Sequence, residues 1–97
     1  MSNPIKVLAV FLAKPGKTEE LKTLLVGVAE ATQRDRGVIL YQLHQDKKEP
    51  RRFVFFESWA SQEDIDLHDA TPHITDLVAQ LPHLTEQGAV DQLTQLV

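Results

Sequence analysis

The segment from Phe53 to His73 holds the side chains of this sequence that are best suited to chemistry, and it reads FVFFESWASQEDIDLHDATPH. An imidazole changes its charge near physiological pH and can take up a proton from a substrate. We therefore predict that His68 is a catalytic base, with a half-exposed histidine that bonds a neighbouring strand as the structural alternative. Trp59 could wall an apolar cavity and offer its indole N–H as a donor, or simply close the end of the core.

Further residues could contact a substrate, namely Tyr41, His44, Glu57 and His73. Tyr41 and His44 lie on opposite faces of a predicted strand, so at most one of them can point into any one cavity. Glu57 shares a face with aromatic residues, and an unpaired carboxylate is costly to bury there. Glu57 is therefore either an acid or base with a raised pKa, or the partner of an arginine such as Arg36 or Arg52.

The two histidines of this segment also have residue types that bind metals. His68 and His73 could both be ligands, but only Asp69 and Asp76 offer a third ligand on the same face. We therefore expect no metal. The chain has no cysteine, which excludes disulfides, thiolate nucleophiles and Cys-ligated zinc.

Length and composition indicate one globular domain, residues 1–97, because 42% of the residues are hydrophobic and 25% are charged. The formal charge of -4 argues against nucleic acid as a partner. The basic residues near Glu49 and Pro50 fit a solvated turn. No apolar run is long enough for a membrane span, and the first residues do not resemble a signal peptide, so we expect a cytoplasmic protein without a membrane partner.

The hydrophobic pattern predicts the elements that must position these residues. Strands are expected at Ile5 to Ala13, Val38 to Gln45 and Arg52 to Trp59, and helices at Thr18 to about Arg34, Ser61 to Asp69 and Pro72 to Leu81. Ser61 and Thr71 are expected as helix caps, with Pro72 at the first helical position and Pro82 closing the last helix. Residues 89–97 fit a strand and a helix about equally well. We assign a strand, which completes a β-α-β-β-α-β ferredoxin-like α+β fold with an antiparallel sheet.

The first strand is apolar on both faces, which is typical of a strand that is covered on both sides. The helices of this fold cover only one face of the sheet. No segment is left to cover the other, so we expect a homodimer whose two sheets face each other.

Three segments of the sequence together resemble a known family. They are the turn Lys14-Pro15-Gly16, the strand end Glu57-Ser58-Trp59, and the corner from Leu67 to His73, which is similar to a recurrent H-x-x-S/T-x-H pattern. On these residues the chain resembles the antibiotic biosynthesis monooxygenase family, which comprises small dimeric α+β barrels and includes quinol monooxygenases. The resemblance covers nearly the whole chain.

The resemblance implies oxygenation of an electron-rich aromatic, a quinol-like or polycyclic small molecule, by dioxygen without metal, flavin or other cofactor. A small-molecule binding or protective protein without turnover is the first alternative. An isomerase of a small ketone is another, and a phosphorylated substrate would require basic residues pointing inward, where Lys6 is the main strand candidate. Haem-degrading relatives carry Asn, Trp and His at positions that align near Leu8, His68 and Val78, so we reject haem degradation.

Overall fold

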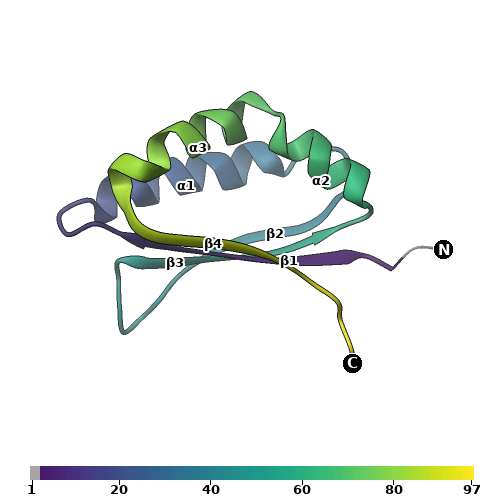
Figure 1. Ribbon diagram of the computed structural model, residues 1–97, viewed down its shortest axis with the longest axis horizontal. Coiled ribbons are helices and arrows are strands. Elements are labelled where there is room, and N and C mark those ends of the chain that lie inside the picture. Colours follow the sequence, from purple (N-terminus) through teal and green to yellow (C-terminus); the bar gives the residue numbers. More distant parts are fainter. Residues whose placement is uncertain (1–2) are drawn as a thin grey trace.

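Three helices lie on one face of a four-stranded antiparallel sheet in the computed structural model, which describes residues 3–97 (Figure 1). The elements are β1 (Ile5–Ala13), α1 (Thr18–Thr32), β2 (Val38–Gln45), β3 (Arg52–Trp59), α2 (Gln62–Asp69), α3 (Pro72–Leu84) and β4 (Thr85–Leu93). The strand order is β2-β3-β1-β4. This confirms the predicted α+β ferredoxin-like fold. Within the described residues, no helix is long and apolar enough to cross a membrane.

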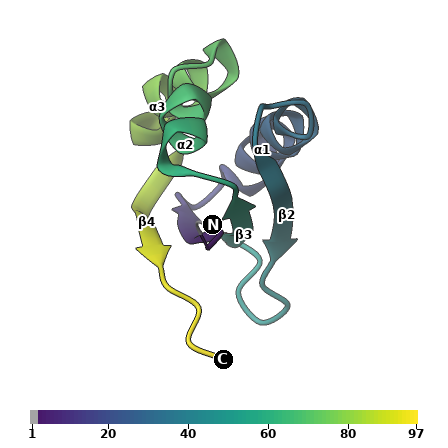
Figure 2. The ribbon, with the colours of Figure 1, turned by 90° about the vertical axis from the view of Figure 1, so that its right-hand side faces the viewer.

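The central strand β1 is paired along almost its whole length with both neighbours. It pairs with β3 from Ile5, opposite Trp59, to Leu12, and with β4 from Lys6, opposite Leu93, to Ala13. Its odd-numbered side chains from residue 7 onward are buried beneath the helices. Figure 2 shows α1 above the β2 edge of the sheet, with α2 and α3 above the β4 edge.

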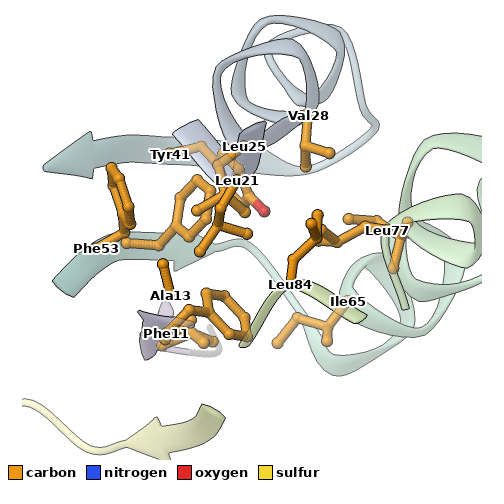
Figure 3. Close-up of a cluster of buried hydrophobic side chains, with 14 of the residues drawn as sticks. Phe11, Ala13, Leu21, Leu25, Val28, Tyr41, Phe53, Ile65, Leu77 and Leu84 are labelled. Carbon is orange, nitrogen blue, oxygen red and sulfur yellow. The ribbon is translucent and has the colours of Figure 1, made fainter. Parts of the chain in front are cut away.

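The core fills the space between the sheet and the helices (Figure 3). The apolar stripe of α1 supplies Leu21, Leu25 and Val28, and α3 supplies Ile74, Leu77 and Leu84. Each such side chain contributes about 1.5–3 kcal/mol when fully buried. This packing fixes the helices over the sheet and so sets the positions of the side chains described below.

The opposite face of the sheet is open in the part of the chain that the structure describes (Figure 1). Leu8, Val10 and Leu12 of β1 are only half-buried there, and Phe56 of β3 is 47% exposed. Both apolar faces of β1 are therefore real, and one of them lacks a cover within this chain.

Two predicted helix ends were wrong. α1 ends at Thr32 instead of about Arg34. The chain turns there, because the Asp35 N–H donates a hydrogen bond to the Thr32 carbonyl and Gly37 adopts a φ of +78°. α3 continues through Pro82 to Leu84. The Lys14 side chain donates to the Pro82 carbonyl and the Lys14 N–H donates to the Leu84 carbonyl, both at 2.9 Å, so these two carbonyls have partners outside the helix.

Two strand details also differ from the prediction. The last strand is Thr85–Leu93 and follows α3 directly, so residues 94–97 lie outside it. In β2 the register shifts between Val38 and Leu40, so Val38 pairs with Trp59 and packs against the core. A strict two-residue alternation predicts Val38 on the same face as Leu40, and the bulge between them breaks that alternation.

Both predicted helix starts are confirmed in position, but only one of the two cap side chains acts as predicted. The Ser61 hydroxyl accepts from the Asp64 backbone N–H at 3.2 Å. Thr71 precedes Pro72 as expected, yet its hydroxyl donates to the His68 carbonyl at 2.7 Å instead. Thr71 therefore stabilises the end of α2 and holds the corner between α2 and α3.

Candidate active site

A cavity of about 180 Å³ lies between the sheet and the pair α2 and α3. Its lining is mostly apolar and comprises Val7, Ala9, Phe11, Tyr41, Phe55, Glu57, Ile65, His68, Asp69, Ile74, Leu77, Val78, Leu81, Val90 and Gln92. Val78 and Val90 are 59% and 63% exposed, so they form an apolar rim between α3 and β4. The cavity thus opens toward solvent at that edge.

Three of the sequence-predicted candidates line this cavity: Tyr41, Glu57 and His68. Trp59 is fully buried behind it and contacts the His68 ring, with 4.5 Å between the ring centroids. His44 is exposed on the opposite face of the sheet, where it stacks on Phe56 at 4.5 Å. The structure therefore separates His44 from the other candidates.

Glu57 is a buried carboxyl group inside the cavity wall. Its Oε1 accepts from the Trp59 indole N–H at 2.9 Å. Burial raises the pKa of Glu57 from its ordinary value of 4.5 to about 7, the Trp59 hydrogen bond opposes this rise, and the charge of Asp69 adds to it. Both protonation states are therefore populated at neutral pH, which suits a group that both gives and takes a proton.

The predicted pairing of Glu57 with an arginine is wrong. Arg36 pairs with Glu63 and Asp64, and Arg52 pairs with Asp46 in the turn between β2 and β3. Both arginines lie outside the cavity wall because they belong to loops or strand ends at the surface. The carboxyl group of Glu57 is thus left with the indole as its polar partner.

Tyr41 stands opposite Glu57 in the pairing of β2 with β3. Its ring packs on Phe55, with centroids 4.9 Å apart, and Figure 3 shows it among the apolar side chains between the sheet and α1. Burial raises the pKa of the Tyr41 hydroxyl well above its usual value, and the charge of Glu57 raises it further. Tyr41 therefore stays protonated and can donate a hydrogen bond.

His68 is buried at the end of α2, and Asp35 fixes its orientation. Its Nδ1 lies 2.7 Å from Asp35 Oδ2. A carboxylate only accepts hydrogen bonds, so Nδ1 carries the proton and Nε2 is the basic nitrogen. The rings of Tyr41 and Trp59 pack against the imidazole, with centroids at 5.3 and 4.5 Å. The arrangement is that of a general base with a carboxylate that holds its tautomer.

Asp35 is the residue that the sequence analysis missed. It lies in the loop between α1 and β2, 33 positions before His68, and its Oδ2 is also 2.9 Å from His73 Nε2. His73 is half-buried and contacts Asp35 instead of the cavity. A polar loop residue has no hydrophobic period that would reveal its partner, so only the fold brings the three side chains together.

The loop that carries Asp35 is clamped to the first turn of α2. Arg36 Nε forms an ion pair with Asp64 Oδ1 at 2.9 Å, although the geometry is not that of a hydrogen bond. Gly37 has a φ of +78°, and a Cβ atom there would overlap the Asp64 carboxylate. The Ala60 N–H also donates to the Gly37 carbonyl at 2.9 Å. These contacts place Asp35 beside the two histidines.

The comparisons with known proteins agree with this architecture. A family model described as antibiotic biosynthesis monooxygenase matches residues 4–80. The chain belongs to this family. The Mycobacterium tuberculosis protein named "Putative monooxygenase Rv0793" is 30% identical over 99% of this chain and 95% of its own length.

Solved structures of other bacterial proteins share the whole fold. The structure of PA3566 from Pseudomonas aeruginosa has a TM-score of 0.94 and 28% identity, and covers 100% of this chain and 98% of its own. The structure of SO0527 from Shewanella oneidensis has a TM-score of 0.92 and 34% identity, and covers 98% of this chain and 93% of its own. The predicted family is confirmed.

Proposed function

We propose that this protein is a cofactor-independent monooxygenase that oxidises a quinol-like aromatic with dioxygen. The observation that carries the proposal is the apolar cavity into which a buried histidine, a glutamic acid of raised pKa and a protonated tyrosine are brought together. Membership of the monooxygenase family supports the same reaction class. Each of the three polar groups has a role in the chemistry of such a substrate.

His68 Nε2 takes the proton of the substrate hydroxyl, and Asp35 stabilises the imidazolium that forms. The resulting phenolate is electron-rich enough to give an electron to dioxygen. The Tyr41 hydroxyl donates to the developing oxyanion, in a cavity where such a bond is strengthened by the scarcity of water.

The reaction needs no external reductant, because the substrate itself supplies the electrons that reduce dioxygen. After the radical pair combines to a peroxide on a ring carbon, the O–O bond breaks, one oxygen stays as a carbonyl and the other leaves as water. A quinol and dioxygen thus give a hydroxyquinone and water, and the substrate supplies all four electrons. Glu57 lines the same cavity and has a pKa of about 7, and we assign to it the protonation of the departing oxygen.

The size of the cavity favours a substrate with one ring inside it. Apolar cavities of about 150 Å³ bind benzene, and the volume here is about 180 Å³. A polycyclic substrate would extend past Val78 and Val90 into the open rim. We therefore place the reacting ring beside His68 and any further ring at the rim.

The lining of the cavity also bears on the two alternatives, an isomerase of a small ketone and a binding protein without turnover. A phosphorylated ketone needs cationic partners, but the described residues that line the cavity include no Lys or Arg. Lys6 points to the open face of the sheet, where its Nζ lies 3.2 Å from the Ser58 hydroxyl. A binding protein without turnover would use the same apolar walls, so a measurement of turnover separates it from the oxygenase.

Dioxygen consumption with a panel of hydroquinones, on protein freed of metal and flavin, tests the proposal. We expect turnover with at least one quinol, and a fall in kcat of about 10²–10⁴-fold in His68→Ala. His83→Ala is the matched control, because His83 is exposed at the far end of α3. Aromatic binding without dioxygen uptake would favour the binding protein, and unchanged rates in His68→Ala would remove His68 from the mechanism.

We further propose that the open face of the sheet forms a homodimer. This face joins Leu8, Val10 and Leu12 to the exposed Phe56 in one apolar surface. Phe56→Asp would place a charge at its centre, so the variant should be monomeric by light scattering while the wild type is dimeric. A wild-type mass of one chain at all concentrations would contradict the proposal.

A further inference from the structure

The cluster of Asp35, His68 and His73 has the composition of a transition-metal site. One ligand atom from each of the three residues lies within 4.8 Å of the others, and Asp35 Oδ2 contacts both His68 Nδ1 and His73 Nε2. Two imidazoles and one carboxylate are a recurrent ligand set for zinc and iron in proteins. We propose that these residues bind one divalent transition-metal ion per chain.

The spacing and the scaffold both suit a metal site. The two histidines are separated by four residues, which falls within the range found for paired histidine ligands of zinc. They lie on either side of the corner between α2 and α3, which the bond from the Thr71 hydroxyl to the His68 carbonyl holds in place. The third ligand, Asp35, comes from the clamped loop, so three separate segments meet at one point.

The distances require only a small rearrangement to admit the ion. Asp35 Oδ2 lies 2.7 Å from His68 Nδ1 and 2.9 Å from His73 Nε2. Ligands about 2.0–2.1 Å from a metal are spaced by roughly 3 Å, which is close to these separations. The two nitrogens must lose their protons, and three coordinate bonds to the ion then replace the two hydrogen bonds.

The ligand types decide which ion is favoured. Imidazole nitrogens suit zinc, cobalt, nickel and iron, whereas magnesium and calcium prefer oxygen ligands. With three ligands from the protein, one or more positions remain for water. Zinc, the probe for the first test, is redox-inactive, so its binding is measured without any oxidation of the site.

Occupancy of this site would also change His68. A metal on Nδ1 leaves the ring proton on Nε2, the nitrogen that the proposed oxygenation needs as a base. Zinc should therefore inhibit turnover. This expected inhibition rests on the proposed function, but the proposal that the site binds metal is independent of it. Binding with no loss of turnover would support the site and count against His68 as the base.

The test is calorimetric titration of chelator-treated full-length protein with zinc chloride, repeated with cobalt for its visible absorption bands. We expect one site per chain, with at least about 100-fold weaker binding in His73→Gln and Asp35→Asn, since even outer-shell partners change metal affinity about 10–100-fold. His83→Gln is the control and should bind like the wild type. Gln at position 73 can keep a hydrogen bond to Asp35, so this variant should also keep its thermal midpoint without metal.

Two results would overturn the proposal. One is the absence of any zinc binding by the wild type. The other is equal affinity in the wild type and in His73→Gln, which would assign the bound ion to another place. Perturbed cobalt bands in His73→Gln with unchanged circular dichroism would instead confirm that the imidazole is a ligand.

Discussion

The buried carboxyl group of Glu57 makes a quantitative prediction about stability. Only 8% of this residue is exposed, and burial raises its pKa from 4.5 to about 7. The folded protein therefore holds this proton more tightly than the unfolded chain. Its contribution to stability is fully present below pH 4.5 and is lost as the pH rises through 7.

The size of the effect follows from the two pKa values. At about 1.4 kcal/mol for each pH unit between 4.5 and about 7, the loss amounts to about 3 kcal/mol. Replacement by Gln keeps an oxygen that can accept from the Trp59 indole but removes the titration. If the two proteins match below pH 4.5, Glu57→Gln should exceed the wild-type free energy of unfolding by less than about 1 kcal/mol near pH 5 and by about 3 kcal/mol near pH 8.

The assay is urea unfolding followed by circular dichroism at pH values from 5 to 8. Glu30→Gln is the control, because Glu30 is exposed on α1 and should follow the wild type at every pH. Asp69, whose pKa burial also raises, titrates in all three proteins and cancels in the comparison. A difference between the wild type and Glu57→Gln that stays constant across the pH range would show that the Glu57 carboxyl group does not hold a proton more tightly in the folded protein.

Two further predictions concern the loop between α1 and β2. Asp35→Asn should lower kcat by about 10²-fold or more with little change in KM, because Asp35 orients His68 without lining the cavity; an unchanged kcat would remove Asp35 from the site. Gly37→Ala should cost roughly 2–4 kcal/mol in chemical unfolding, since a left-handed Ala costs about 1–2 kcal/mol and its Cβ would displace Asp64. Gly16 also has a positive φ, but a Cβ atom there would meet nothing within 4 Å, so Gly16→Ala should lose only the backbone contribution to stability. Equal losses in both variants would contradict the proposed contact between Gly37 and Asp64.

The sequence predicted the fold well because its elements carry regular hydrophobic periods. The 3.6-residue stripe of α1 and the doubly apolar β1 leave few other arrangements. The predictions that failed concern single residues whose partners lie elsewhere in the chain. α3 runs on through Pro82 to Leu84, where Lys14 donates to the Pro82 carbonyl, and Val38 packs inward because of a bulge in the pairing of β2 with β3.

The site was only partly predictable for the same reason. His68 and Glu57 stood out by residue type, and both line the cavity. Asp35 did not, because nothing in a short polar loop indicates that it will meet two histidines more than thirty positions away. His44 was an equally good candidate by type. The alternation of the strand predicted that only one of Tyr41 and His44 could reach a cavity, and the fold shows that it is Tyr41.

The central claim is that the cavity oxygenates an aromatic ring with dioxygen and its own side chains. Turnover of a hydroquinone by metal-free and flavin-free protein under ¹⁸O₂, followed by mass spectrometry of the product, tests it most directly. We expect one ¹⁸O atom in each product molecule, and no labelled product from His68→Ala. A product whose new oxygen comes from water, or no product from any quinol that binds, would contradict it.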